Sequence, residues 1–193
     1  MNKVESFELD HRKVKAPYIR KCCLLNGPKG DSVTKFDIRF LQPNKEAFGT
    51  AAMHGLEHLL AYELRNNLEG IIDLSPMGCR TGFYLSVFGD REASEIKVAI
   101  ENALNKVLKA TEIPAANDIQ CGNYRDLSLF GAKEYAKEAL NRGFSLSIYA
   151  AWKEKCVRPF LITSVKNMEN VKKNISTPII TAIFPKIKMK LLN

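Results

Sequence analysis

The sequence predicts an α+β fold, in which a mainly antiparallel sheet packs against helices within a single domain. Two observations support this prediction. Strand-like and helical patterns follow one another in irregular order, without the regular alternation that builds a parallel sheet. The chain has 193 residues, 46% of them hydrophobic and 26% charged, which is enough for one domain with a buried core.

The first part of the chain, up to about residue 41, is expected to be rich in strands. Phe36, Ile38 and Phe40 alternate with polar residues after the turn-forming segment 26–31. This alternation directs Arg39 away from the core face of its strand. Taken alone, Arg39 would be interpreted as an exposed strand charge.

Apolar residues at helical spacing predict a helix from about residue 50 to residue 67. The spacing is set by Met53, Leu56, Leu60 and Leu64, and the helix is expected to stop before Gly70.

Two strands and two helices are expected after this first helix. The strands should occupy residues 71–74 and 83–88, separated by a loop that contains one proline and two glycines. Apolar spacing then predicts helices at about 91–109 and 130–141, the second of which ends at Gly143.

The predicted first helix carries the strongest functional signal. His54 and His58 are four residues apart, so both imidazoles lie on one side of the helix and can bind one metal ion. Glu57 lies beside them as a proton acceptor. The alternative is a pair of histidines that simply face the core or the solvent.

A catalytic ion usually takes three protein ligands and leaves one position open, so a third ligand is expected elsewhere. The candidates are Cys79, Cys121, His11 and several carboxylates. Cys121 precedes a glycine in a predicted loop, where the backbone can turn toward a metal. Cys79 precedes Arg80, whose charge would favour the reactive thiolate if the two side chains meet. For either cysteine alone, a buried inert thiol is the more ordinary interpretation.

The net charge of +8 is concentrated in the last part of the chain. From residue 144 onward there are 9 Lys and Arg against 2 Asp and Glu, which leaves the rest of the chain nearly neutral. We therefore predict a catalytic domain over residues 1–144 that binds neither nucleic acid nor membrane. The basic tail, residues 145–193, is expected to be either a disordered appendage or a surface-binding helix.

The sequence carries no recognisable targeting segment. No apolar run has the length of a signal peptide or a membrane span, so a cytoplasmic protein is expected. Five cysteines are an odd number, which suits free thiols in a reducing compartment. Cys22 and Cys23 lie in an apolar run and are expected to be structural.

Several segments together resemble the S-ribosylhomocysteine lyase family (LuxS), whose members release homocysteine and the precursor of the autoinducer-2 signal. The resemblance covers about residues 4–143, and its motifs occur in order at residues 6–11, 36–40, 54–58, 73–84 and 120–126. The HxxEH pattern alone is a weak signal, whereas these motifs in combination are specific.

The resemblance implies a role for each matching residue. His54, His58 and Cys121 match the family's metal ligands, with one divalent ion per subunit; Fe²⁺ is expected, and Zn²⁺ or Co²⁺ is also accepted. Glu57 and Cys79 match its two acid–base residues. The residues that match its substrate pocket are Ser6, His11, Arg39 and Asp73. The family also builds each pocket across a homodimer interface, which implies two identical sites per dimer.

Two other functions are compatible with the HxxEH pattern. A peptidase with this pattern uses the glutamate as a base toward a metal-bound water, but takes a downstream glutamate as third ligand and is much longer. A non-catalytic module would close all four metal positions with protein ligands and would use the basic tail to bind nucleic acid or membrane.

Overall fold

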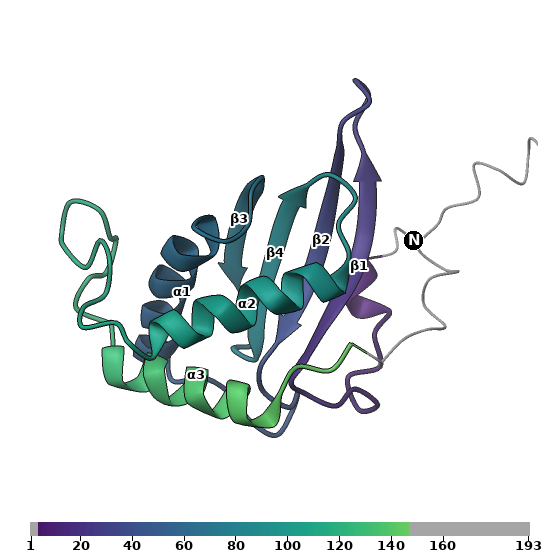
Figure 1. Ribbon diagram of the computed structural model, residues 1–193. Helices are drawn as coiled ribbons and strands as arrows, with labels where there is room; N and C mark the ends of the chain where they lie inside the picture. The colour runs from purple at the N-terminus through teal and green to yellow at the C-terminus, as the bar shows by residue number, and fades with distance from the viewer. Residues whose placement is uncertain (1–3, 147–193) are drawn as a thin grey trace, which may run out of the picture. The chain divides into compact units, whose positions relative to one another are not determined.

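The computed structural model describes residues 4–146, which form a four-stranded sheet with three helices on one of its faces (Figure 1). A short 3-10 helix, η1 (Glu5–Phe7), comes first. The strands are β1 (Tyr18–Asn26), β2 (Ser32–Arg39), β3 (Ile71–Pro76) and β4 (Gly82–Phe88), and the helices are α1 (Thr50–Arg65), α2 (Ala93–Val107) and α3 (Leu129–Arg142). The α+β prediction is confirmed for these residues.

The strands are ordered β1-β2-β4-β3, and every neighbouring pair is antiparallel. β2 therefore lies inside the sheet, with Arg39 opposite Tyr18 on one side and opposite Gly82 on the other. Because side chains alternate along a strand, Phe36 and Ile38 enter the core beneath the helices, whereas Asp37 and Arg39 lie on the opposite face.

One hydrophobic core fills the space between the sheet and the three helices. Its fully buried members come from all of these elements and include Phe36, Ile38, Leu56, Leu60, Phe83, Leu85, Ile100 and Leu104. A second, smaller cluster joins the segment before β1 to the sheet and consists of Leu9, Val14, Ala16 and Tyr18. The sheet is thus covered on both faces near β1 and β2.

The predicted helices agree with the observed ones to within two residues at each end, and Gly143 is the C-terminal cap of α3, with a φ of 71°. β1 and β2 confirm that the first part of the chain is rich in strands, but residues 4–17 and the alternative interpretation of Arg39 differ from the structure. Among the described residues, 4–17 contain no strand, because this segment crosses the outer face of the sheet instead of joining it. Arg39 is only 2% exposed, since that segment helps to cover it, so it is not a surface charge.

The predicted basic tail falls largely outside the described residues. Ser145 still pairs with Tyr18 of β1 in a parallel bridge, and residues 147–193 are not described. The domain boundary near residue 144 therefore stays a prediction. Within the described part of the chain, no helix has the length and apolar character needed to cross a bilayer.

Candidate metal centre and active site

Helix α1 presents His54 and His58 to the long connection between α2 and α3. His54 Nδ1 lies 2.8 Å from the backbone oxygen of Asp126, and His58 Nδ1 lies 2.8 Å from the backbone oxygen of Pro114. A carbonyl oxygen can only accept a hydrogen bond, so both Nδ1 atoms must carry the ring proton. With the proton on Nδ1, the neutral form of each imidazole carries its lone pair on Nε2, which is the arrangement found in metal-binding histidines.

Cys121 is the third member of this group. Its Sγ lies 3.4 Å from His54 Nε2, and all three donor atoms lie within 4.8 Å of one another. Donors around one tetrahedral ion are about 3.3–3.8 Å apart, so these residues fit a divalent metal after a small closure. Three protein donors leave a fourth position for water or substrate, which is typical of a catalytic site.

The connection before α3 is held against α1 by close backbone packing. The Ser128 amide donates to the Ala51 oxygen at 2.9 Å, and the Ser128 hydroxyl caps α3 by accepting from the Gly131 amide at 3.0 Å. A Cβ on Gly55 would lie 2.9 Å from the Ser128 oxygen, so this close approach needs a glycine. Gly55 therefore lets the connection that carries Cys121 lie near the two histidines.

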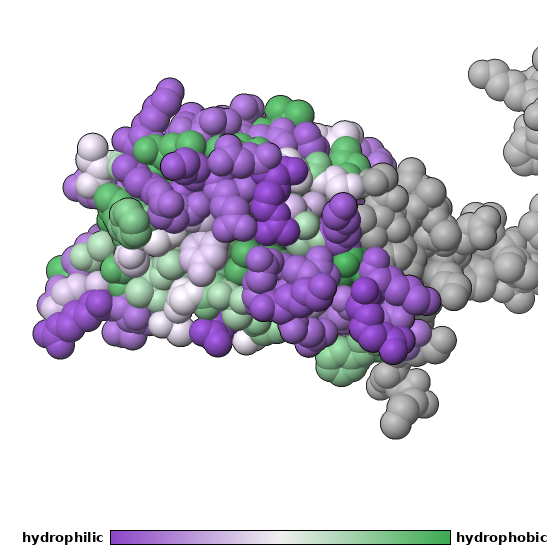
Figure 2. Space-filling view, turned by 90° about the horizontal axis from the view of Figure 1, so that it is seen from below, coloured by the Kyte–Doolittle hydropathy of each residue, from purple (hydrophilic) through white to green (hydrophobic). Residues whose placement is uncertain are grey.

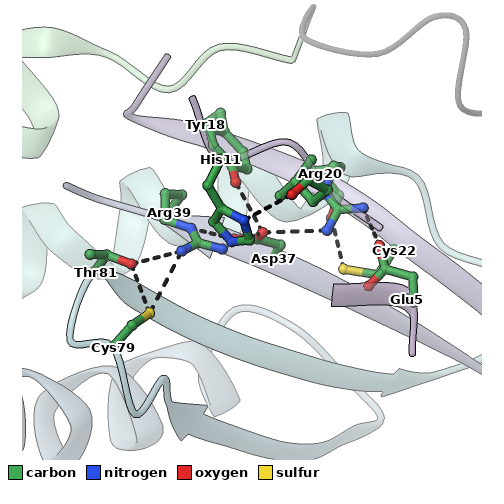
Figure 3. Close-up of polar contacts among 10 residues, drawn as sticks. Glu5, His11, Tyr18, Arg20, Cys22, Asp37, Arg39, Cys79 and Thr81 are labelled. Atoms are coloured by element: carbon green, nitrogen blue, oxygen red, sulfur yellow. Dashed lines mark hydrogen bonds and ion pairs between the residues drawn. The ribbon is translucent and has the colours of Figure 1, made fainter. Parts of the chain in front are cut away.

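A second group of polar residues lies on the other face of the sheet, at the ends of β2 and β4 (Figure 3). Arg39 Nη1 donates to Thr81 Oγ1 at 2.7 Å and lies 3.8 Å from Cys79 Sγ. Thr81 Oγ1 is in turn 3.1 Å from Cys79 Sγ. Arginine, threonine and cysteine thus form a closed triangle of contacts.

Asp37 holds the arginine of this triangle. Its carboxylate, which is fully buried, accepts from Arg39 Nε at 3.1 Å and from Arg39 Nη2 at 2.8 Å. It also accepts from the Tyr18 hydroxyl at 3.0 Å and pairs with Arg20, which binds Glu5 of η1 as well.

The charges of this network keep its members in fixed protonation states. Burial alone would lower the pKa of Arg39, but the hydrogen bonds and charge of Asp37 outweigh it and raise the pKa above the ordinary value. Burial, and then the charge of Asp37, raises the pKa of the Tyr18 hydroxyl. Arg39 is therefore always a cation and Tyr18 a neutral donor.

An open cavity of about 570 Å³ lies beside the Arg39–Cys79–Thr81 triangle, and His11 lines it as well. The His11 Nδ1 lies 2.9 Å from the Leu9 oxygen and so donates to it, which leaves Nε2 as the acceptor when the ring is neutral. Three of the predicted site residues, His11, Arg39 and Cys79, thus meet at one cavity.

Two predicted pocket residues lie outside the lining of that cavity. Ser6 is in η1, near the Tyr84 hydroxyl, and Asp73 is an exposed residue of the edge strand β3, where its carboxylate accepts from the Ser75 hydroxyl. The expected partnership of Cys79 with Arg80 is wrong in detail. Arg80 donates to the Phe48 backbone oxygen at 3.1 Å, and Arg39 supplies the positive charge beside Cys79.

The other cysteines of the described region fit structural roles. Cys22 is buried in β1, and burial raises the pKa of its thiol well above the usual value. Cys23, beside it, is half-buried.

The metal-binding group and the cavity are distinct in this chain. The cavity lining includes none of His54, His58, Cys121 or Glu57. Glu57 is half-buried on α1, which packs against the core face of the sheet, while Arg39 lies on the opposite face. Residues predicted to form one site therefore fall into two groups.

Residues 4–149 match the model of the S-ribosylhomocysteinase (LuxS) family. The chain belongs to the LuxS family. A protein of Clostridium botulinum (strain Alaska E43 / Type E3), named S-ribosylhomocysteine lyase, is 87% identical over 149 residues, which are 77% of this chain and 99% of that protein. Proteins of the same name from Clostridioides difficile (strain 630) and Enterococcus faecalis (strain ATCC 700802 / V583) are 70% and 56% identical, over 77% and 76% of this chain and 99% and 95% of their own.

The LuxS match spans both groups of site residues, from η1 to the end of α3. Sequence reasoning missed Asp37, Thr81 and Tyr18, although Asp37 and Arg39 are two residues apart on one strand and so share a face. The two-residue spacing is the one sequence signal that could have predicted a contact between Asp37 and Arg39.

Proposed function

We propose that this LuxS-family protein cleaves S-ribosylhomocysteine to homocysteine and 4,5-dihydroxy-2,3-pentanedione, and so acts as a carbon–sulfur lyase. The observation that carries the proposal is the donor set of His54, His58 and Cys121, with both Nδ1 atoms tied to backbone oxygens. In a chain of this family, these three donors would hold a divalent ion and leave one position open for substrate.

The reaction requires that a carbonyl group move along the sugar. The sulfur is on the last sugar carbon, and it can leave only when the hydrogen on the neighbouring carbon is acidic. The aldehyde at the other end is too far away to make it so. Two successive proton shifts between adjacent carbons bring the carbonyl next to that hydrogen, and removal of the hydrogen then expels the homocysteine sulfur as a thiolate.

Each step forms negative charge on a sugar oxygen and moves a proton. A metal ion at His54, His58 and Cys121 would act as a Lewis acid that polarises the sugar carbonyl. The protons need acceptors that face the substrate. We assign these roles to the Cys79 thiolate and the Glu57 carboxylate, each of which takes a proton from one atom of the substrate, becoming a thiol or a carboxylic acid, and returns it to another atom.

The substrate pocket contributes binding and orientation. Arg39 is a permanent cation beside the cavity and suits a carboxylate or a sugar oxygen, and His11 offers Nε2 as an acceptor. Ser6 and Asp73 are proposed to complete the pocket.

A second copy of the chain would unite the two groups of residues. One chain keeps the metal donors and the Cys79 cavity apart, so we infer a homodimer in which each site takes one group from each subunit. Hydrophobic surface lies exposed among hydrophilic side chains (Figure 2). Phe7, next to Ser6, is 82% exposed, and Ile119, near Cys121 in sequence, is 91% exposed. Phe130 at the start of α3 is 77% exposed as well. Both groups of site residues therefore have an exposed apolar neighbour that a partner subunit can bury.

We further propose Fe²⁺ as the native ion, with Zn²⁺ and Co²⁺ as substitutes, and the cytoplasm as the location. An imidazole and thiolate donor set accepts all three metals, so the choice in cells depends on their supply.

Thiol release from S-ribosylhomocysteine tests the proposed function. The metal-loaded full-length protein should release homocysteine, which a thiol reagent detects, and Cys79→Ala and Glu57→Ala should each slow release about 10²- to 10⁴-fold. Lys29→Ala, in the exposed turn between β1 and β2 and outside the cavity lining, serves as the control. No release by the wild type would favour a non-catalytic metal module, and unchanged release by both variants would refute their roles.

A further inference from the structure

The closest polar neighbour of the Cys79 sulfur is a threonine that the reaction scheme above does not use. Thr81 Oγ1 lies 3.1 Å from Cys79 Sγ, whereas Arg39 Nη1 lies at 3.8 Å (Figure 3). Thr81 is 3% exposed. Its backbone oxygen accepts from the amides of Phe40 and Leu41 at 3.0 Å each, so the main chain at this position is firmly held.

The directions of the hydrogen bonds around Thr81 follow from the chemistry of its partners. A guanidinium can only donate, so Thr81 Oγ1 must accept the 2.7 Å hydrogen bond from Arg39. The hydroxyl hydrogen and one further lone pair then remain for the sulfur. Thr81 can accept from Cys79 when the sulfur is a thiol and donate to it when the sulfur is a thiolate, by rotation of the hydroxyl alone.

Arg39 cannot turn away to release Thr81. Asp37 holds its Nε and Nη2 at 3.1 and 2.8 Å, and both residues are almost completely buried. The remaining Nη1 is therefore aimed at Thr81 and Cys79.

We propose that Thr81 is a positioning residue for proton transfer at Cys79, whose hydroxyl holds the sulfur in place and bonds to it in both protonation states. The inference rests on the acid–base role proposed for Cys79. When the thiol gives its proton to the substrate, the hydroxyl of Thr81 turns from acceptor to donor, and it turns back when the thiolate takes up a proton. No bond to Thr81 is made or broken.

The other charged and titratable groups around the cavity are His11 from the segment before β1, and Lys45 and Glu46 from the loop after β2, together with Arg39 of β2. These four are identical in wild type and in Thr81 variants. A difference between the variants therefore reports the hydroxyl.

Alkylation of Cys79 as a function of pH tests the inference without substrate. Iodoacetamide reacts with the thiolate, and Cys79 is exposed and is the single cysteine of the tryptic peptide 66–80, which mass spectrometry can follow. In the metal-loaded full-length protein, Thr81→Val should move the midpoint of the rate profile up by about one pH unit and slow alkylation at neutral pH about tenfold, because the thiolate loses a charge-assisted hydrogen bond. Thr81→Ser keeps the hydroxyl and should stay within about twofold of wild type.

Two outcomes separate this inference from the proposed function. A Thr81→Val profile that coincides with those of wild type and Thr81→Ser would overturn the inference, even if homocysteine is released normally. Absence of homocysteine release by the wild type would overturn the proposed function, while the alkylation profiles would still test Thr81. Metal content at His54, His58 and Cys121 should be unchanged in each variant, and Thr81→Ala answers the same question if the valine variant does not fold.

Discussion

The buried carboxylate of Asp37 should be essential for the stability of the fold, and Asp37→Asn tests this directly. Asparagine keeps the size of the side chain and removes its charge. Arg39, 2% exposed, and Arg20, 6% exposed, would then lose the fully buried anion that both contact. Removing one partner of a buried ion pair costs about 3–5 kcal/mol, because the remaining charge cannot return to water.

The assay is urea unfolding at a fixed protein concentration, since association would make the result depend on concentration. The midpoint should fall without a change in slope. For a domain of this size the same loss corresponds to a melting temperature lower by about 6–20 °C. Asp90→Asn is the matched control, because Asp90 pairs with Lys21 but is 59% exposed, and it should cost no more than about 1 kcal/mol. Equal losses for the two variants would refute the importance of the buried network.

Three further predictions follow from the described contacts. Gly82→Ala should destabilise the protein by about 1–3 kcal/mol in urea unfolding, because a Cβ at this position would lie 2.3 Å from the Ile38 backbone oxygen. An unchanged urea midpoint would contradict the close pairing of β2 with β4 at this position. His58→Ala should lower bound metal at least about tenfold by elemental analysis, and full retention would exclude this residue as a ligand. The pKa of the Tyr18 hydroxyl is raised from 10.0, so the folded state holds this proton more tightly than the unfolded state. The stabilisation from the bound proton is complete below about pH 10 and is lost as the pH rises above it, so the free energy of unfolding of Tyr18→Phe should fall less steeply than that of wild type between about pH 9.5 and 11. Free energies that fall in parallel for the two proteins would contradict this.

Much of the fold could be predicted because its signals are local. The helical spacing of Met53, Leu56, Leu60 and Leu64 predicted α1, and the strict alternation around Phe36 and Ile38 predicted β2 and the face on which Arg39 lies. The segment before β1 could not be predicted in the same way. Its path depends on contacts of Leu9 and Val14 with a distant strand, and a local pattern carries no information about such contacts.

The candidate site residues also differ in whether local sequence patterns could predict their contacts. His54 and His58 are one helical turn apart, so their meeting could be predicted from spacing, whereas the meeting of Cys121 with His54 depends on how the connection before α3 folds back on α1. From the residues alone, Cys79, His11 and several carboxylates stayed open as third ligands beside Cys121, which its loop position favoured. The family resemblance pointed to Cys121, which the structure groups with the histidines. The contact of Cys79 with Arg39 and Thr81, rather than Arg80, follows from the pairing of β2 with β4.

Co-expression of two inactive variants tests most directly the claim that the metal group and the Cys79 group act together across two subunits. His58→Ala and Cys79→Ala should each be inactive alone. In mixed dimers, one site receives both defects and the other receives none, so random pairing should restore about a quarter of the wild-type homocysteine release. Release that stays at the level of the separate variants, in samples where mass spectrometry finds mixed dimers, would contradict the proposed shared site.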